Sequence, residues 1–154
     1  MSTLQLRASD GNTLSAYVVK PEGTPRGAVV VVQEIFGVNS HVRRVVEQYA
    51  AAGYVAIAPA MFDRFQKDVD LGYDAQGIEQ GVAFMMRTTN ASTLADLNAA
   101  IAAVSHAGRG GIEIVHERCA RALPPDAPER AGEGACIGVV GAEVAADVAH
   151  AEPG

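Results

Sequence analysis

The sequence has few cysteines, no cluster of cations and no long apolar run, and each shortage excludes a class of protein. Two cysteines, Cys119 and Cys136, are too few for a disulfide framework in a chain of 154 residues. The net charge of −6, with Lys and Arg scattered, predicts no nucleic-acid partner and argues against binding to an anionic membrane surface. No stretch approaches the ~20 apolar residues of a membrane span, and the first residues lack a signal-peptide core. We therefore expect a cytoplasmic protein with no membrane partner.

Aromatic residues are also missing from the last third of the chain, where none follows Phe84. Beyond Gly108 the composition is dominated by Ala, Gly, Pro, Glu and Arg, and the prolines of residues 124–128 exclude regular structure there. We therefore divide the chain into residues 1–108, part of an α/β domain, and residues 109–154, an atypical and irregular tail that we expect to be poorly ordered. Residues 137–141, Ile-Gly-Val-Val-Gly, are the one plausible strand in this tail.

What is present in the first part is an alternation of strand and helix patterns. Residues 4–8 and 14–20 alternate apolar and polar side chains around Asp-Gly, which predicts an antiparallel hairpin. The uninterrupted Ala-Val run of residues 28–32 is typical of a strand covered on both faces. Helical spacing of apolar residues follows from Ser40 to Gly53, and residues 54–58 read as the next strand, ended by Pro59. This order predicts an α/β fold with a mostly parallel sheet.

Two more helices are expected after an irregular segment, residues 61–74, of the kind that often covers a binding cleft. The first, residues 76–86, contains Gly77 and Gly81, each of which costs about 1 kcal/mol relative to Ala, so we expect it to be interrupted. The second begins at a capping box over residues 93–96. Its apolar stripe consists of Leu94, Leu97, Ile101 and Val104.

The segment between the valine strand and the first helix carries the strongest functional signal. Residues 33–39 read Gln-Glu-Ile-Phe-Gly-Val-Asn, and Asn39 is suited to cap the helix. Open α/β sheets bind ligands at the carboxyl ends of their strands, so Glu34 and the backbone N–H groups beside it form a candidate active-site loop.

Residues 31–39, Val-Val-Gln-Glu-Ile-Phe-Gly-Val-Asn, together with residues 53–59, Gly-Tyr-Val-Ala-Ile-Ala-Pro, resemble the dienelactone hydrolase family. In weaker form the resemblance to these carboxymethylenebutenolidase-like enzymes extends from Leu4 to about Gly108. It implies a partial α/β-hydrolase fold and a Cys-Asp-His triad that acts on small ester or lactone substrates. It implies no cofactor and no metal.

The resemblance also implies roles for individual residues. Glu34 matches the acid that interacts with the resting cysteine, and Ile35 matches the position whose N–H contributes to the oxyanion hole. Arg64 is a candidate for binding a substrate carboxylate. The arginine that the family uses for that purpose has no match near Gly77 and Ile78.

The nucleophile motif is not in its expected context. Residues 134–138, Gly-Ala-Cys-Ile-Gly, match the family's Gly-x-Cys-x-Gly motif and make Cys136 the candidate nucleophile. In this fold the motif forms the nucleophile elbow, a sharp turn that needs a strand before it and a helix after it. If residues 137–141 are instead the strand before the elbow, Ala142 and Glu143 follow it and no nucleophile is present. We therefore hypothesise that a truncation or frameshift after Gly108 removed a complete triad.

Other readings stay open. Without its triad, the chain is a non-catalytic remnant or a partner-binding fragment, with possible self-association through an uncovered sheet edge. His116, Glu117 and Cys119 stand close together, but only Cys136 and His150 could complete a zinc site, and we expect no metal.

Overall fold

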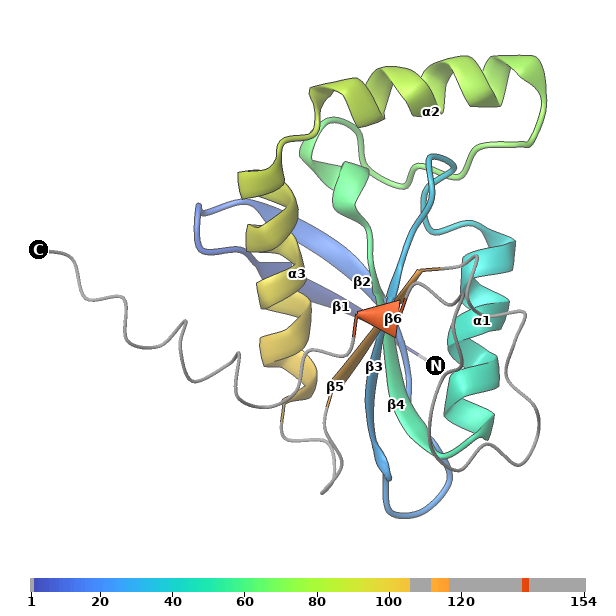
Figure 1. Ribbon diagram of the computed structural model, residues 1–154, viewed down its shortest axis with the longest axis vertical. Helices are drawn as coiled ribbons and strands as arrows, with labels where there is room; N and C mark the ends of the chain where they lie inside the picture. The colour runs from blue at the N-terminus through green and yellow to red at the C-terminus, as the bar shows by residue number, and fades with distance from the viewer. Residues whose placement is uncertain (1, 106–111, 117–136, 139–154) are drawn as a thin grey trace, which may run out of the picture.

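The computed structural model describes residues 2–105, 112–116 and 137–138, and they form a single mixed sheet with helices around it (Figure 1). The strands follow the order β1-β2-β4-β3-β5-β6. Their bounds are β1 Ser2–Arg7, β2 Thr13–Val19, β3 Gly27–Val32, β4 Tyr54–Pro59, β5 Ile112–His116 and β6 Ile137–Gly138. The helices are α1 Ser40–Ala51, α2 Ala75–Arg87 and α3 Asn90–Val104, with a single 3-10 turn, η1, at Met61–Arg64.

The centre of the sheet is parallel and its flanks are antiparallel. Strand β3 pairs in parallel with both β4 and β5, whereas β1 with β2, β2 with β4, and β5 with β6 are antiparallel pairs. The expected hairpin and strand-helix-strand unit are confirmed. The sheet is mixed rather than mostly parallel.

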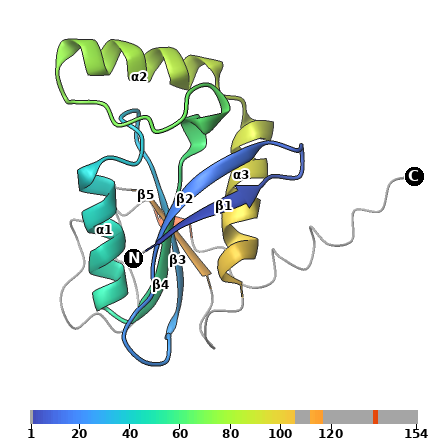
Figure 2. The ribbon, with the colours of Figure 1, turned by 180° about the vertical axis from the view of Figure 1, so that it is seen from behind.

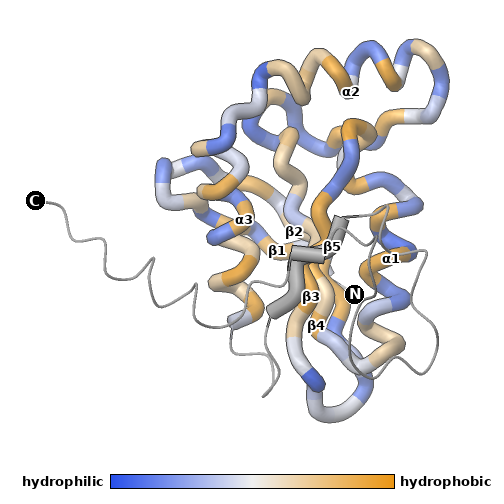
Figure 3. Tube along the Cα trace, viewed as in Figure 1, coloured by the Kyte–Doolittle hydropathy of each residue, from blue (hydrophilic) through white to orange (hydrophobic). Residues whose placement is uncertain are grey.

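Two helices cover opposite faces of the sheet, as the views from front and back show (Figures 1 and 2). Val29 and Val31 of β3 pack with α1, whereas Val30, between them, packs with α3 on the other face. Successive residues of a strand point to opposite faces, so the run of four valines in β3 needs apolar neighbours on both sides. Figure 3 shows hydrophobic residues along the central strands and mixed hydropathy along α1.

Helix α2 differs from the prediction because it is continuous. It runs from Ala75 to Arg87 without a break at its glycines, and Gly77 and Gly81 are its buried residues. The prediction treated the glycines only as a propensity cost, whereas they give the helix a face that other backbone can approach closely.

Helix α3 begins earlier than predicted. The capping box is made by Thr89 and Ser92, whose side chains each accept a hydrogen bond from the other residue's backbone N–H. The buried face contains Ala95, Asp96, Ala100 and Val104, while Leu94 is 59% exposed. The predicted start at residue 93 was therefore wrong. Of the predicted stripe, Leu97, Ile101 and Val104 pack in or against the core, and only Leu94 does not.

Strand β5 was not predicted. Residues 112–116 pair with Ala28 to Val32 of β3, so the sheet continues beyond the expected boundary at Gly108. The predicted strand at residues 137–141 is present as Ile137–Gly138, and its other residues lie outside the described part. Among the described residues, no helix has both the length and the apolar character needed to cross a bilayer.

Candidate active site

The segment after β3 forms a closed turn at the carboxyl end of the central strands. The Gly37 N–H donates to the Glu34 carbonyl over 3.4 Å, and Gly37 has a φ of 79°, which favours glycine. A Cβ at Gly37 would lie 2.0 Å from the Val69 carbonyl oxygen. The Leu71 N–H donates to the Phe36 carbonyl at 3.0 Å, so the turn is fastened to the segment that leads into α2.

Gln33 orients the peptide group that links Glu34 to Ile35. Its side chain is buried and accepts the Met61 N–H at 2.9 Å, which ties the end of β3 to the start of η1. The same amide donates to the Glu34 carbonyl over 3.4 Å. Because the N–H and C=O of a trans peptide point in opposite directions, holding this carbonyl aims the Ile35 N–H away from Gln33. No acceptor for the Ile35 N–H is found among the described residues.

Helix α2 rests directly on this turn. A Cβ at Gly81 would lie 2.1 Å from the Ile35 carbonyl oxygen, so only glycine permits the observed approach. A Cβ at Gly77 would lie 2.0 Å from the Gly72 carbonyl oxygen. The Gly77 N–H donates to the Asp74 carboxylate at 2.8 Å. The glycine pair spaced four residues apart was a sequence signal for this contact.

Asn39 connects the turn to two other elements. Its side-chain oxygen accepts the N–H groups of His41 and Val42, which confirms it as the N-cap of α1. Its amide nitrogen donates to the Tyr73 hydroxyl at 3.1 Å. The Tyr73 ring packs at 4.4 Å on the ring of Phe36, so the segment before α2 is held against the turn on this side as well.

Arg64 is engaged by carboxylates of this chain. Its guanidinium makes a bidentate ion pair with the buried Asp96, with distances of 2.7 and 2.8 Å, and a further ion pair with Asp10 at 2.7 Å. Hydrogen bonds to Asp96 and then Asp10 raise the pKa of Arg64, and the Arg64 hydrogen bond lowers the pKa of the exposed Asp10. These contacts link η1 to α3 and to the β1–β2 turn. Substrate binding by Arg64 stays a prediction.

The strand register places the ends of β3, β5 and β6 side by side. Val32, two residues before Glu34, pairs with His116, and the preceding residue of β5, Val115, pairs with Ile137. Ile137 directly follows Cys136 in the sequence. Cys119 and Cys136 themselves lie outside the described residues, so the structure does not test either thiol as a partner of Glu34. Within the described residues, no three His, Cys, Asp or Glu side chains form a group that could hold a metal ion.

Comparison with known proteins decides the family. The profile of the dienelactone hydrolase family matches residues 14–115. The chain belongs to the dienelactone hydrolase family. It is 44% identical over 90 residues to a candidate carboxymethylenebutenolidase of Synechocystis, covering 58% of this chain and 37% of the relative. It is 31% identical over 104 residues to the carboxymethylenebutenolidase of Pseudomonas putida, covering 67% of this chain and 44% of the relative.

Solved structures agree with this assignment. A candidate dienelactone hydrolase from Klebsiella pneumoniae superposes with a TM-score of 0.58 at 28% identity, over 75% of this chain and 50% of that one. A dienelactone hydrolase-like promiscuous phosphotriesterase from metagenomic libraries, at 21% identity and a TM-score of 0.55, shares the fold. The chain thus has part of an α/β-hydrolase fold, as predicted, and spans less than half the length of the two carboxymethylenebutenolidase relatives.

Three contributors to the site were missed by sequence reasoning. Gln33 is a polar residue that ends an all-apolar strand, Gly81 lies in a small-residue face of α2, and Tyr73 follows a glycine just before that helix. The first two carried a recognisable signal. Tyr73 did not, because its partners Phe36 and Asn39 are more than thirty residues away.

Proposed function

We propose that this chain provides the Glu34–Ile35 part of a cysteine-dependent ester or lactone hydrolase site. The observation that supports the proposal is the orientation of the Ile35 peptide at the carboxyl end of β3, next to β5. A backbone N–H held in advance stabilises a developing oxyanion without reorganisation, and loss of one such donor costs about 10²–10³ in rate in other hydrolases.

The proposed chemistry begins with a thiol. The Cys136 proton passes to the Glu34 carboxylate, and the thiolate attacks the carbonyl carbon of the ester. The carbonyl oxygen becomes an oxyanion that accepts a hydrogen bond from the Ile35 N–H. The oxyanion collapses to a thioester carbonyl as the C–O bond of the leaving group breaks, and the alkoxide takes up the proton that Glu34 received from Cys136. Water then attacks the thioester, which releases the carboxylic acid and returns its second proton to the cysteine as the thiol. Cys136 is supported by its sequence position directly before Ile137, a residue whose backbone lies about two strand spacings, or roughly 10 Å, from Val31 of β3.

A chromogenic short-chain ester, p-nitrophenyl acetate, tests this function. We expect thiol-dependent turnover that is lost in Cys136→Ala and retained in Cys119→Ala, the matched control for general thiol reactivity. Glu34→Gln should keep the turn but alter the pH dependence of turnover, since the amide cannot accept the thiol proton. Equal loss in both cysteine variants, or turnover unchanged in Cys136→Ala, would contradict the assignment of the nucleophile.

The second candidate is a non-catalytic remnant that associates through the sheet edges. Two observations favour it: β1 lies at one edge of the sheet, and β6 covers only Ile114 and Val115 of the five-residue β5. Unpaired strand edges are templates for pairing with another chain. Leu4, 39% exposed on β1, offers a test. Absence of turnover, together with a concentration-dependent mass in sedimentation that Leu4→Lys reduces, would favour this candidate.

A further inference from the structure

Helix α2 carries an apolar stripe that the described part of the chain does not cover. Ile78 is 45% exposed, Val82 38% and Met85 47%. The buried residues of the helix are its two glycines, and its larger contact with the body of the protein is made by Phe84, whose ring lies 5.2 Å from that of Phe62 and 6.2 Å from that of Phe65. Three large apolar side chains in a row on a helix at the edge of a candidate site are typical of a ligand-binding wall.

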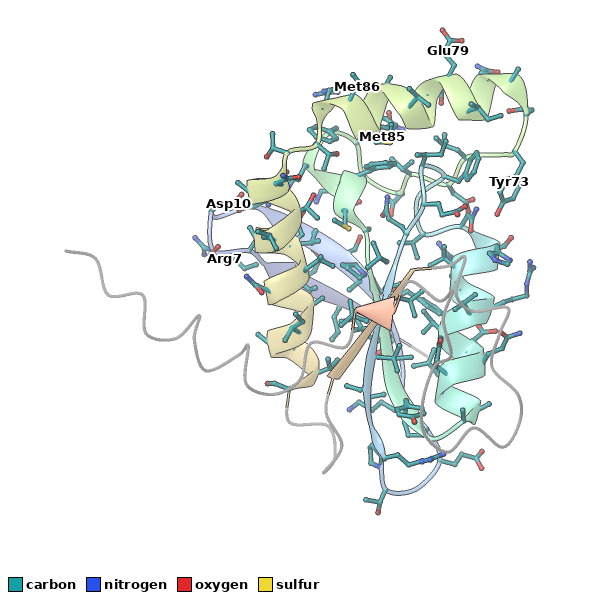
Figure 4. All side chains as sticks on the ribbon, in the orientation of Figure 1. Arg7, Asp10, Tyr73, Glu79, Met85 and Met86 are labelled. Atoms are coloured by element: carbon teal, nitrogen blue, oxygen red, sulfur yellow. The ribbon has the colours of Figure 1, made fainter. Side chains whose placement is uncertain are left out.

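The position of the stripe follows from the contact at Gly81. At about 100° per residue, Met85 lies roughly 40° and Ile78 roughly 60° from the direction of Gly81, and both are on the same side. Because Gly81 faces the Ile35 carbonyl, these side chains flank the turn. Figure 4 shows Met85 beneath α2, toward the strands, and Glu79 on the outer side of the helix. Met86, roughly 140° from Gly81, is 76% exposed.

The described cations nearest to α2 in the sequence are already engaged. Arg64 pairs with two carboxylates, and the Lys67 ammonium donates to the Thr13 carbonyl at 2.6 Å and lies 3.5 Å from Asp63. The Arg87 guanidinium lies 4.3 Å from the centre of the Phe65 ring.

The same segment carries several acidic groups. Glu34 is in the turn, the Asp70 backbone pairs with Gly37 in a bridge, and the Asp74 carboxylate caps α2. Arg43 also contacts this loop: it donates to the Val38 carbonyl at 3.1 Å and lies 5.7 Å from the centre of the Tyr17 ring. A substrate that carries its own carboxylate would compete with the carboxylates of the protein here, whereas an uncharged apolar group would meet the stripe.

We propose that Ile78, Val82 and Met85 bind the apolar acyl chain of an uncharged ester beside the Ile35 N–H. This proposal rests on the proposed function and specifies its substrate class. The side chains of the stripe are about half exposed, so we expect them to cover each methylene of the bound acyl chain on one side only. We therefore expect kcat/KM to rise about two-fold per added methylene from acetate to hexanoate, against the roughly four-fold that full burial of a methylene gives.

The test compares p-nitrophenyl acetate, butyrate and hexanoate with p-nitrophenyl hemisuccinate, whose acyl chain ends in a carboxylate. Hexanoate should exceed hemisuccinate at least ten-fold in kcat/KM. Ile78→Ser and Met85→Ser should flatten the chain-length dependence. Ala83→Ser, at an exposed position roughly 160° from Gly81 on the side of the helix away from the stripe, should leave it unchanged and is the matched control.

A binding measurement separates this proposal from the proposed function. The probe is 2-octanone, an uncharged and unreactive ketone, and the readout is the NMR shift of the α2 amides, with octanoate as the charged comparison. Shifts with 2-octanone but no turnover of any ester would support the stripe and refute the hydrolase. Turnover without chain-length preference, or hemisuccinate cleaved as well as hexanoate, would overturn the stripe alone. If neither turnover nor amide shifts are seen, both proposals are overturned. Amide shifts that depend on the protein concentration and not on the 2-octanone concentration would overturn the stripe alone.

Discussion

Gly81→Ala is the sharpest perturbation of the contact between α2 and the site, because sequence and structure predict opposite signs for it. Helix propensity alone favours Ala over Gly by about 1 kcal/mol in a helix interior. In the structure, a Cβ at Gly81 would lie 2.1 Å from the Ile35 carbonyl oxygen. Relative to an ordinary contact of 3.4 Å, helix and turn would have to separate by about 1.3 Å.

The magnitude follows from the kind of atom that is met. Overpacking costs typically about 1–3 kcal/mol, and the upper end applies here because the neighbour is a backbone carbonyl rather than a flexible side chain. After subtraction of the propensity gain, the free energy of unfolding should fall by about 2 kcal/mol. That corresponds to a Tm roughly 4–8 °C lower for a chain of this size.

Thermal unfolding followed by circular dichroism measures this change. Ala83→Gly, at an exposed position in the same helix, is the control and should cost about 1 kcal/mol through propensity alone. Hydrogen exchange should rise in residues 75–87 of Gly81→Ala, and any ester turnover should fall because Ile35 is displaced. A Tm that rises in Gly81→Ala would refute the close approach of α2 to the turn.

Three further predictions concern the supports of the site. Asp96→Asn should lower the free energy of unfolding by about 3 kcal/mol in denaturant titrations, because it removes one partner of a buried ion pair, whereas Asp10→Asn, at an exposed carboxylate, should change it little. Gln33→Leu leaves a buried backbone N–H without its acceptor and should cost about 1–3 kcal/mol in the same assay; an unchanged midpoint would contradict the bond. Burial and the acceptance of its hydroxyl hydrogen bond by Glu47 raise the pKa of Tyr17 above 10.0, so the folded state retains the proton longer and stability should fall as the pH rises above about 10. Tyr17→Phe should flatten that alkaline decline.

The elements predicted correctly from sequence are those whose signals are local. The hairpin β1–β2, strand β3, helix α1 and strand β4 each have a turn residue or cap at their ends and a clear apolar period between them. Their observed bounds differ from the predicted ones by one or two residues at most ends. The order of the strands in the sheet was not predicted, because local patterns do not contain it.

The errors in α2 and α3 have a common physical cause. In both helices small residues share the packing face with larger ones: Gly77 and Gly81 lie beside Phe84 in α2, and Ala95 and Ala100 lie beside Val104 in α3. Small residues allow close approach of backbone, and that gain is visible only once the neighbouring element is known.

Strand β5 was missed because composition was weighed over a whole segment. Its sequence, Ile-Glu-Ile-Val-His, alternates at first in the manner of a strand, but it lies in a region poor in aromatic residues and rich in glycine. Its partner β3 is more than eighty residues earlier in the chain, so no local pattern indicates the pairing. The two cysteines lie between β5 and β6 in the sequence, outside the described residues.

The supports of the Ile35 peptide make stability and chemistry separable in this protein. The turn is held by Gln33, by the segment before α2 and by Gly81, all within residues 2–105, and none of these contacts involves a cysteine. Substitution of Cys136 should therefore abolish turnover while the Tm stays unchanged. Gln33→Leu should lower both, because it releases the peptide that carries the proposed oxyanion donor. If Cys136→Ala lowered the Tm as much as Gln33→Leu does, the turn would depend on the thiol. The inference that the Ile35 N–H is oriented independently of the cysteine would then be wrong.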